Sequence, residues 1–348
     1  MGITADARHQ PNHSPLTIHY SQIAAYVGQT PSGSNVAFHT ATTLETSTGA
    51  ALRLYVEPAA GRPRGVVQIS HGLCEHAGRY SPFARFLAGR GFHVYAHDHR
   101  GHGATAAPAT PRGSFGPRPA ARNVLADVLD VHRHVSESHP DLPVFLFGQS
   151  MGAMVVLAIL ARRSLSVAGV AAYNMPFPSR FAARAAKAVL AWERFRLGSD
   201  VPSRLLPRFT FQAWADAVPD ACTPFDWLSR DRESVGAFMA DPSCGLAPAV
   251  GVWEAVFDFS LAIAAPGAFA ALRKDLPIRL VGGGADPVTS YGRAVLRLES
   301  HLRRKGFLNL ETSLYAENRH ESLNELNRNL IMGEFATWAE RVSARRTD

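Results

Sequence analysis

Residues 144–157 read VFLFGQSMGAMVVL and form the most informative stretch of this sequence. Four apolar residues come first, then GQSMG (148–152), and then an apolar run long enough for a helix. A G-x-S-x-G sequence between a buried strand and a helix is typical of a nucleophile elbow, in which a sharp turn exposes a serine hydroxyl. The stretch therefore predicts a strand–turn–helix unit of an α/β sheet, with Ser150 as the candidate nucleophile.

Each part of this pentapeptide has a physical task. Gly148 and Gly152 carry no Cβ, so the turn can close and the helix can begin against a neighbouring strand. Met151, the first helical residue, presents its backbone N–H beside Ser150, where the positive end of the helix dipole also lies. Glycine and serine are equally common in ordinary turns, so the pentapeptide needs an acid and a base later in the chain to support catalysis.

Composition indicates a soluble globular protein. The chain has 348 residues, of which 46% are apolar and 19% charged, enough for a large α/β domain with an insertion or for two smaller domains. No apolar run approaches the roughly 20 residues that span a bilayer, and the first residues lack the pattern of a secretory signal. Three widely spaced cysteines, Cys74, Cys222 and Cys244, suit a reducing compartment. We therefore expect a cytoplasmic protein.

The net charge of +7 could indicate nucleic acid or an anionic surface as a partner. The basic residues are scattered, however, with only short clusters at 162–163, 303–305 and 345–346. Arginine supplies most of them in a chain rich in alanine, proline and glycine, which a biased genome composition explains equally well. We expect no nucleic-acid partner.

Strands and helices alternate along much of the chain. We expect strands at 36–46, 51–57, 66–69, 92–96, 143–147, 167–173, 277–281 and 308–315. We expect core helices at 82–90, 122–138, 151–162, 291–305 and 322–342. This alternation predicts right-handed crossovers and a mostly parallel sheet with helices on both faces.

The alternation stops between 176 and 271, where the sequence is helical and rich in aromatic residues. These aromatic residues can form a core of the segment itself. The segment also follows the sixth strand, so it would lie above the carboxyl ends of the parallel strands, where open α/β sheets bind ligands. We expect a flexible arm at 1–35, a core at 36–175 and 272–348, and a helical cap at 176–271.

An acid and a base follow the elbow in the order that catalysis requires. Asp286 lies in GGGADPV (282–288), after a strand; a phosphate loop would need G-x-x-x-x-G-K-S/T, which is absent. Asp286 could instead cap the next helix. Of the two later histidines, His301 falls within a helix, where we expect a solvated face, and His320 falls in a loop. The order Ser150, Asp286, His320 is that of α/β-hydrolases.

Five segments together resemble the monoacylglycerol lipase and lysophospholipase branch of the α/β-hydrolase superfamily, which is similar to the S33 serine aminopeptidases. They are HGLCEHAGRY (71–80), AHDHRGHG (96–103), GQSMG (148–152), GGGADPV (282–288) and NRHESLNE (318–325). The resemblance covers the chain from about residue 36 to its end. It implies an α/β-hydrolase fold with a helical cap and a catalytic triad.

Carried over to this sequence, the resemblance implies Ser150 as nucleophile, Asp286 as acid and His320 as base. The backbone N–H groups of Leu73 and Met151 match the oxyanion hole. Other polar residues match loops that hold the oxyanion segment: His71, Glu75, His76, Asp98, Arg100 and His102. Cys74 departs from the pattern, which often has a small residue there. We expect Cys74 to be buried and inert.

The expected protein is a serine hydrolase that cleaves carboxylic esters of lipid-like substrates, such as a monoacylglycerol or a lysophospholipid, through an acyl-enzyme. No cofactor and no metal are expected. The expected partner is a small-molecule acyl ester or lipid, with transient membrane-surface contact through the cap. Peptidases, thioesterases, acyltransferases and non-catalytic binding proteins use the same fold, and the fold does not decide among them.

Overall fold

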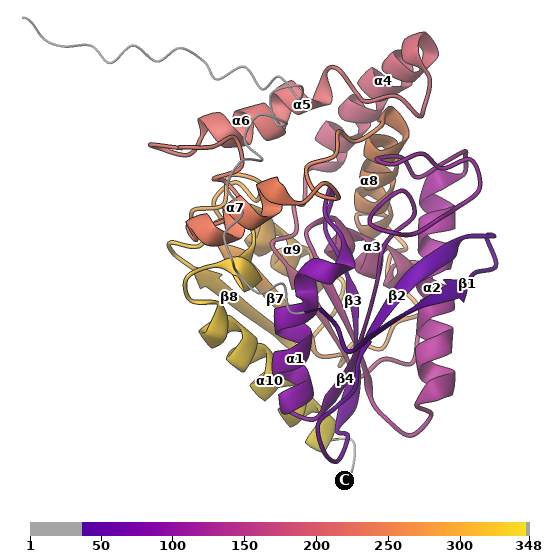
Figure 1. Cartoon of the computed structure of the whole chain (residues 1–348), viewed down its shortest axis with the longest axis vertical. Coiled ribbons are helices and arrows are strands. Elements are labelled where there is room, and N and C mark those ends of the chain that lie inside the picture. Colours follow the sequence, from indigo (N-terminus) through magenta and orange to yellow (C-terminus); the bar gives the residue numbers. More distant parts are fainter. Residues whose placement is uncertain (1–36, 346–348) are drawn as a thin grey trace, which may run out of the picture.

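A single eight-stranded sheet forms the centre of the molecule (Figure 1). The computed structural model describes residues 37–345, so the expected arm at 1–35 lies outside the described residues. The strands are β1 (Thr40–Glu45), β2 (Ala51–Glu57), β3 (Gly65–Ser70), β4 (Phe92–His97), β5 (Val144–Gln149), β6 (Gly169–Tyr173), β7 (Ile278–Gly283) and β8 (Leu310–Tyr315). Their order in the sheet is β1-β2-β4-β3-β5-β6-β7-β8.

The sheet is mostly parallel, as the alternation of elements predicted. β1 pairs antiparallel with β2, and β2 pairs antiparallel with β4. All remaining pairs are parallel. Every residue of β3, β5, β6 and β7 is buried, because central parallel strands are covered on both faces.

Helices cover both faces of the sheet. α1 (Ser81–Gly89) and α10 (Arg328–Ala344) share one hydrophobic cluster with the sheet. α2 (Ala120–Ser138), α3 (Met151–Leu160) and α9 (Arg293–Arg304) share a second cluster, which belongs to the other face. Within residues 37–345, no helix combines the length and the apolar character needed to cross a bilayer.

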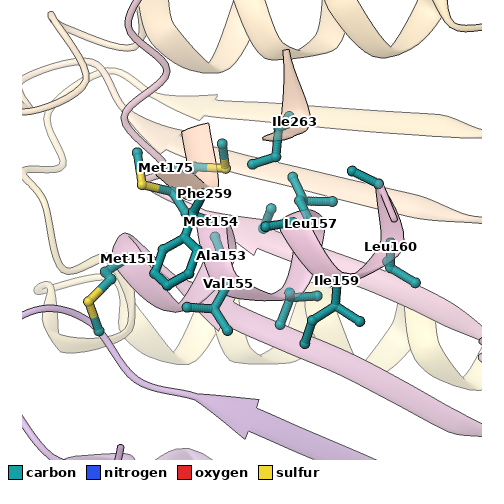
Figure 2. Packing of buried hydrophobic residues seen from close by; sticks show 14 of the residues in the cluster. Met151, Ala153, Met154, Val155, Leu157, Ile159, Leu160, Met175, Phe259 and Ile263 are labelled. Carbon is teal, nitrogen blue, oxygen red and sulfur yellow. The ribbon is translucent and has the colours of Figure 1, made fainter. Parts of the chain in front are cut away.

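The helix that follows the elbow, α3, is buried along its whole length. A helix that is hydrophobic on every side must be covered on every side. Phe259 and Ile263 of α8 (Val250–Ile263) belong to the same cluster as Met154 and Leu157 of α3 (Figure 2). α8 is the last helix of the segment that we expected to be a cap, and it is also part of the packing of the core.

The chain between β6 and β7 is helical and adds no strand to the sheet. Besides α8 it contains α4 (Arg180–Leu197), α5 (Leu206–Phe209), α6 (Phe211–Asp216) and α7 (Arg232–Ala240). α4, α5 and α6 lie at the top of Figure 1, away from the sheet, and α4 packs against α8. The aromatic rings of Phe211, Trp214, Trp227 and Trp253 contact one another, so this segment does have a small core of its own.

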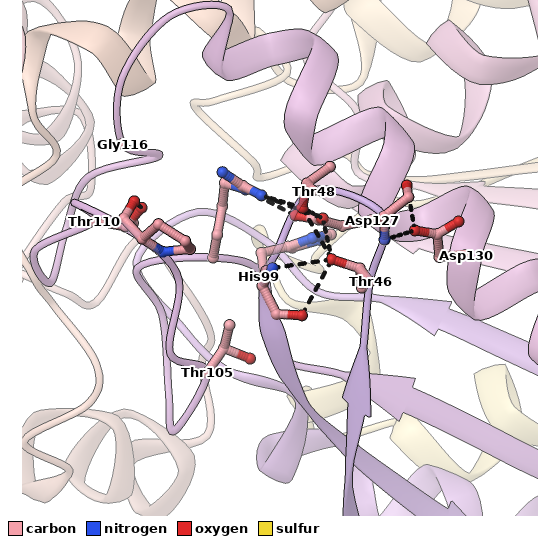
Figure 3. A network of polar contacts seen from close by, with 12 residues as sticks. Thr46, Thr48, His99, Thr105, Thr110, Gly116, Asp127 and Asp130 are labelled. Carbon is pink, nitrogen blue, oxygen red and sulfur yellow. Dashed lines mark hydrogen bonds and ion pairs between the residues drawn. The ribbon is translucent and has the colours of Figure 1, made fainter.

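The turn between β1 and β2 is fixed to α2 by buried polar contacts (Figure 3). Asp127 of α2 accepts hydrogen bonds from the hydroxyls of Thr46 and Thr48. Nε of Arg100 donates to the same carboxylate at 2.7 Å. Arg100 and Asp127 are both almost fully buried. The side chain of Arg100 therefore anchors the edge hairpin to the loop that follows β4.

The last helix begins later than the sequence predicted. Residues Ser322–Asn324 form a 3-10 turn, η3, and α10 begins at Arg328. Between them Glu325 is extended, with a ψ of 168°. Its carboxylate accepts from the backbone N–H of Arg319 at 2.8 Å and from Nε of Arg230 at 3.0 Å. These long-range contacts outweigh the local helical pattern.

Candidate active site

Ser150 lies at a strained turn between β5 and α3. Its φ of +52° is in the region that favours glycine, as is typical of a nucleophile elbow. The flanking glycines leave no room for side chains. A Cβ on Gly148 would lie 2.4 Å from the backbone N of Ala153, and one on Gly152 would lie 2.0 Å from the carbonyl O of Ser70. The turn therefore depends on both glycines.

Ser150, His320 and Asp286 form one chain of hydrogen bonds at the carboxyl edge of the sheet. They follow β5, β8 and β7, respectively. Nε2 of His320 lies 2.9 Å from Oγ of Ser150, and Nδ1 lies 2.9 Å from Oδ2 of Asp286. Nδ1 faces a carboxylate and so carries the proton, which leaves Nε2 to accept from the serine hydroxyl. The structure thus brings together the three residues that the sequence singled out.

Asp286 is completely buried. Its Oδ1 accepts from the backbone N–H of Val288, and its Oδ2 accepts from the hydroxyl of Thr289, each at 2.9 Å. Helix α9 begins at Arg293, after the N-cap residue Gly292. The alternative interpretation of Asp286 as the cap of this helix is therefore wrong.

The pKa of His320 lies above its ordinary value of 6.5. Burial alone would lower this pKa, but the negative charge of Asp286 and the hydrogen bond to it outweigh burial. Glu321 and Glu75 act in the same direction as Asp286. A base must be unprotonated to take the serine proton, so this pKa would set the acid limb of a pH–activity profile.

Leu73 and Met151 line the same cavity as Ser150, and each carries a backbone N–H group. Met151 is the first residue of α3, where a helical N–H has no partner within the helix. Leu73 follows β3 and lines the same cavity as Ser150. Among residues 37–345, neither N–H donates to another group. Both are therefore available to an oxyanion.

Glu75 holds the loop of Leu73 in place. One carboxylate oxygen accepts from the backbone N–H of Gly72 at 2.6 Å and from the hydroxyl of Tyr80 at 2.7 Å. The other accepts from Arg79 at 2.6 Å. The same guanidinium donates two hydrogen bonds to Glu321, the residue after His320. The oxyanion loop and the histidine loop are thus linked through buried charges.

The loop after β4 also supports the oxyanion segment. The backbone N–H of His99 donates to Nε2 of His71 at 2.9 Å. Asp98 accepts from the backbone N–H of Ala77 at 2.8 Å. The ring of His102 packs beside the ring of His71, with centroids 5.5 Å apart. The structural roles that we expected of His71 and Asp98 are confirmed by these contacts.

His76 connects the loop after β3 to the helical segment between β6 and β7. Its Nε2 lies 2.8 Å from Oδ2 of Asp241, and Cys244 lies close enough for the three side chains to suggest a metal site. However, Nδ1 of His76 accepts from the backbone N–H of Gly78, so Nε2 carries the proton. A metal-binding histidine needs the opposite arrangement, with its second nitrogen donating. The contact is therefore a hydrogen bond between the loop after β3 and the chain that follows α7.

Cys74 is buried and lines the cavity next to Leu73. Burial and the charge of Glu75 raise the pKa of its thiol, so the side chain is a thiol at neutral pH. Its φ of +61° is unusual for a residue with a side chain. Its carbonyl O accepts from the backbone N–H of Gly245 in the cap at 2.9 Å. Cys74 thus lines the site as a buried thiol, as we expected.

A narrow cavity of about 70 Å³ leads from Ser150 into the helical segment. Its far walls are mainly aromatic side chains of this segment: Phe211, Trp214, Phe225, Trp227, Phe238 and Trp253. Ligand pockets usually measure about 300–1,000 Å³. A long acyl chain would therefore enter only if these side chains move apart.

His301 has no part in the site. It lies on α9, and its Nε2 makes a hydrogen bond with the carbonyl O of Ile263 at 3.0 Å. The side chain is half-buried beside the ring of Phe177. The expected solvated face is wrong, because the end of α8 packs against this part of α9.

No sequence pattern indicated a backbone connection between the helical segment that follows β6 and the loop of His320. The backbone N–H of His320 donates to the carbonyl O of Trp227 at 3.2 Å, and that of Glu321 donates to the carbonyl O of Leu228 at 2.7 Å. Arg319 adds a side-chain hydrogen bond to the carbonyl O of Asp226 at 2.6 Å. Backbone pairing of this kind leaves no side-chain pattern, so only the structure reveals it.

The sheet order, the elbow and the Ser–His–Asp arrangement define the chain as an α/β-hydrolase. The family described as serine aminopeptidase, S33, matches residues 61–327, and the chain belongs to this family. The fold class and the resemblance predicted from the sequence are both confirmed.

Known lipases are similar to most of the chain. A monoacylglycerol lipase of Mycolicibacterium smegmatis is 30% identical over 79% of this chain and 88% of its own length. A monoglyceride lipase of Mus musculus is 28% identical over 83% of this chain and 87% of its own. A solved structure of a lipase in an open form has a TM-score of 0.76 and 28% identity, covering 87% of this chain and 99% of that one. The chain is a carboxylic ester hydrolase with a lipase-like function.

Proposed function

We propose that this hydrolase cleaves the carboxylic ester of a lipid-like substrate, a monoacylglycerol or a lysophospholipid, through an acyl-enzyme on Ser150. The observation that carries the proposal is the hydrogen-bonded chain of Ser150, His320 and Asp286 at the end of an aromatic cavity. The names of the relatives, monoglyceride and monoacylglycerol lipases, support the same substrate class.

The proposed reaction has two halves. Oγ of Ser150 attacks the acyl carbonyl while Nε2 of His320 takes the hydroxyl proton, and the N–H groups of Leu73 and Met151 stabilise the oxyanion. The intermediate expels the alcohol, which receives that proton from His320. Water then attacks the acyl-enzyme with His320 again as base, and the fatty acid leaves. Asp286 keeps the imidazole in the required tautomer throughout.

The cavity favours esters over peptides. An aminopeptidase would need a carboxylate free to pair with the ammonium group of its substrate. Two carboxylates, Glu75 and Glu321, line the cavity, and both are already paired with Arg79. The remaining walls are mainly apolar, and each methylene buried against them would contribute about 0.8 kcal/mol.

A substrate panel on the purified protein tests this proposal. The rate constant kcat/KM should rise from acetate through butyrate to octanoate esters, measured below micelle-forming concentrations, and aminoacyl anilides should react poorly. A fluorophosphonate probe should label the wild type, whereas Ser150→Ala should be folded, unlabelled and inactive. An optimum at acetate would contradict the lipid substrate, and labelling of Ser150→Ala would contradict the nucleophile.

We also propose that the cap touches lipid surfaces. Large apolar side chains on its outer surface are strongly exposed: Phe181, Trp192 and Phe195 on α4, and Phe209 on α5. Positions 181, 192 and 195 share one face of α4, opposite the buried Ala183 and Leu190. Exposed arginines lie among them: Arg180, Arg184, Arg196, Arg204 and Arg208. Aromatic side chains with cations around them suit the surface of an anionic bilayer.

A reducing compartment, such as the cytoplasm, is our proposal for the location of the protein. The three cysteines support it, because all of them are free thiols. Cys74 and Cys244 are buried beside the catalytic loops, where oxidation would disturb the packing. Immunodetection in separated cell fractions tests this placement, and recovery in an oxidising compartment would contradict it.

A further inference from the structure

Asn174 is a completely buried polar residue that no sequence motif singled out. It follows β6 directly, between the strands that precede the nucleophile and the acid. Its φ of +47° is in the left-handed region, which asparagine tolerates better than most residues. Its backbone N–H donates to the carbonyl O of Val281 at 2.7 Å, so its position relative to β7 is fixed.

The side-chain amide of Asn174 contacts the acid and both sides of the base. Nδ2 donates to Oδ2 of Asp286 and to the carbonyl O of Arg319, each at 3.3 Å. Oδ1 accepts from the hydroxyl of Ser322 at 2.8 Å. Two acceptors face the nitrogen and one hydroxyl faces the oxygen, so the orientation of the amide is determined by its partners. Arg319 directly precedes His320 in the sequence, and Ser322 follows it by two residues.

We propose that Asn174 is the positioning residue that sets the distance between the Asp286 carboxylate and the His320 imidazole. This inference rests on the proposed function. Asn174 acts through those two residues and is not among the residues that line the cavity. Its loss should therefore lower kcat and leave KM unchanged, the pattern of an interaction that matters only in the transition state.

Two substitutions separate this role from a merely structural one. Asn174→Gly keeps the left-handed backbone without strain and removes the amide; kcat should fall by up to about 100-fold, the effect of a small misplacement of catalytic groups. Ala109→Gly is the matched control, because Ala109 is also left-handed, with a φ of +48°, but lies on the surface. It should keep the wild-type kcat.

Asn174→Asp gives a readout that a structural role would not change. The new carboxyl group at position 174 would lie so close to the Asp286 carboxylate that the two share one proton at moderate pH. In this protonated form the new group can donate to Asp286 as the amide does. Loss of this proton adds a charge to those of Asp286, Glu321 and Glu75 that already act on His320. The added charge holds the proton on the imidazole up to higher pH, so the acid limb of the kcat/KM profile should lie at higher pH than in the wild type.

The outcomes distinguish the two proposals. Asn174→Gly with a wild-type kcat, or Asn174→Asp with the acid limb at the wild-type pH, would overturn the role of Asn174 and leave the triad intact. Activity in Ser150→Ala would overturn the triad and the role of Asn174 with it. A reduced kcat, an unchanged KM and continued labelling of Asn174→Gly by the fluorophosphonate probe would support both.

Discussion

His320 makes contacts through both of its ring nitrogens and through its backbone N–H. Its two ring nitrogens contact Ser150 and Asp286, while its backbone N–H is held by Trp227 of the cap segment. The imidazole must gain and lose a proton in each half of the proposed reaction without changing its place. The imidazole can stay in place because His320 is held through both its ring and its backbone. Protonation then changes the charge of the ring and leaves these contacts in place.

The pH dependence of activity follows from the environment of His320. Its pKa is raised above 6.5, so kcat/KM should rise with pH through a midpoint above that value, as the imidazole loses its proton. His320→Ala should lower kcat by several orders of magnitude, and Asp286→Asn by roughly 10⁴-fold, because the tautomer is lost. Kinetics on purified variants across the imidazole range measure these effects.

His301→Ala is the control for these variants. It removes the second histidine that follows the acid, whose Nε2 makes a hydrogen bond with the carbonyl O of Ile263. It should leave the profile unchanged. If His301→Ala were the more damaging substitution, or if wild-type activity were flat across the imidazole range, His320 would not be the base.

At the scale of elements, the elbow shows how a few backbone atoms fix a catalytic geometry. α3 approaches β3 so closely that Gly152 and the carbonyl O of Ser70 leave no space for a Cβ. The close approach places the N-terminus of α3 beside the loop after β3, which carries Leu73. The two proposed oxyanion donors thus come from two elements that meet at one glycine.

A pair of glycine substitutions tests this dependence. Gly152→Ala should destabilise the fold by about 1–3 kcal/mol or more, because backbone must move to admit the methyl group, and activity should be lost. Gly236→Ala, in helix α7, is the matched control, because its Cβ would meet nothing within 4 Å. It should stabilise the protein by about 0.5–1 kcal/mol. Denaturant unfolding measures both, and equal stabilities would contradict the role of Gly152.

Local patterns predicted the elements of the core well. The strand before the elbow, the apolar helix after it and the parallel order of the sheet all follow from hydrophobic periodicity. The end of the chain was harder, because Glu325 interrupts a helical pattern to bind Arg230, which is distant in the sequence. The residues of the proposed triad could be singled out because motifs mark each of them. Asn174 was not, since its role arises from a contact between the ends of β6, β7 and β8 that no local pattern encodes.

At the scale of the whole molecule, two parts of the cap segment differ. The part around Trp227 and Leu228 is bonded to the histidine loop, while α4 and α5 carry exposed aromatic side chains. Large exposed apolar groups that gather on one side of a protein often mark an interaction surface. The substrate we propose would reside in or near a lipid phase, which is where such a surface would bring the enzyme.

Vesicle sedimentation tests the proposed lipid contact. The wild type should bind vesicles that contain anionic lipid better than neutral vesicles, because arginines surround the aromatic side chains. Phe181→Ser combined with Phe195→Ser should reduce binding but keep kcat on a water-soluble ester. Leu308→Ser is the matched control, since Leu308 is 78% exposed but lies between α9 and β8. Equal binding of all three proteins would contradict a docking role for α4.

The backbone pairing of Trp227 and Leu228 with His320 and Glu321 limits how this enzyme can be recombined. A chimera that exchanges the cap for that of a relative must keep residues 226–231 with the histidine loop that they hold, or it will misplace the base as well as the substrate. Junctions placed before 226 would exchange Phe211, Trp214 and Phe225 of the cavity and keep Trp227 with the histidine loop. During evolution, helices α4 to α6 could therefore diverge quickly. Residues 226–231 would change only together with the loop of His320 that they hold.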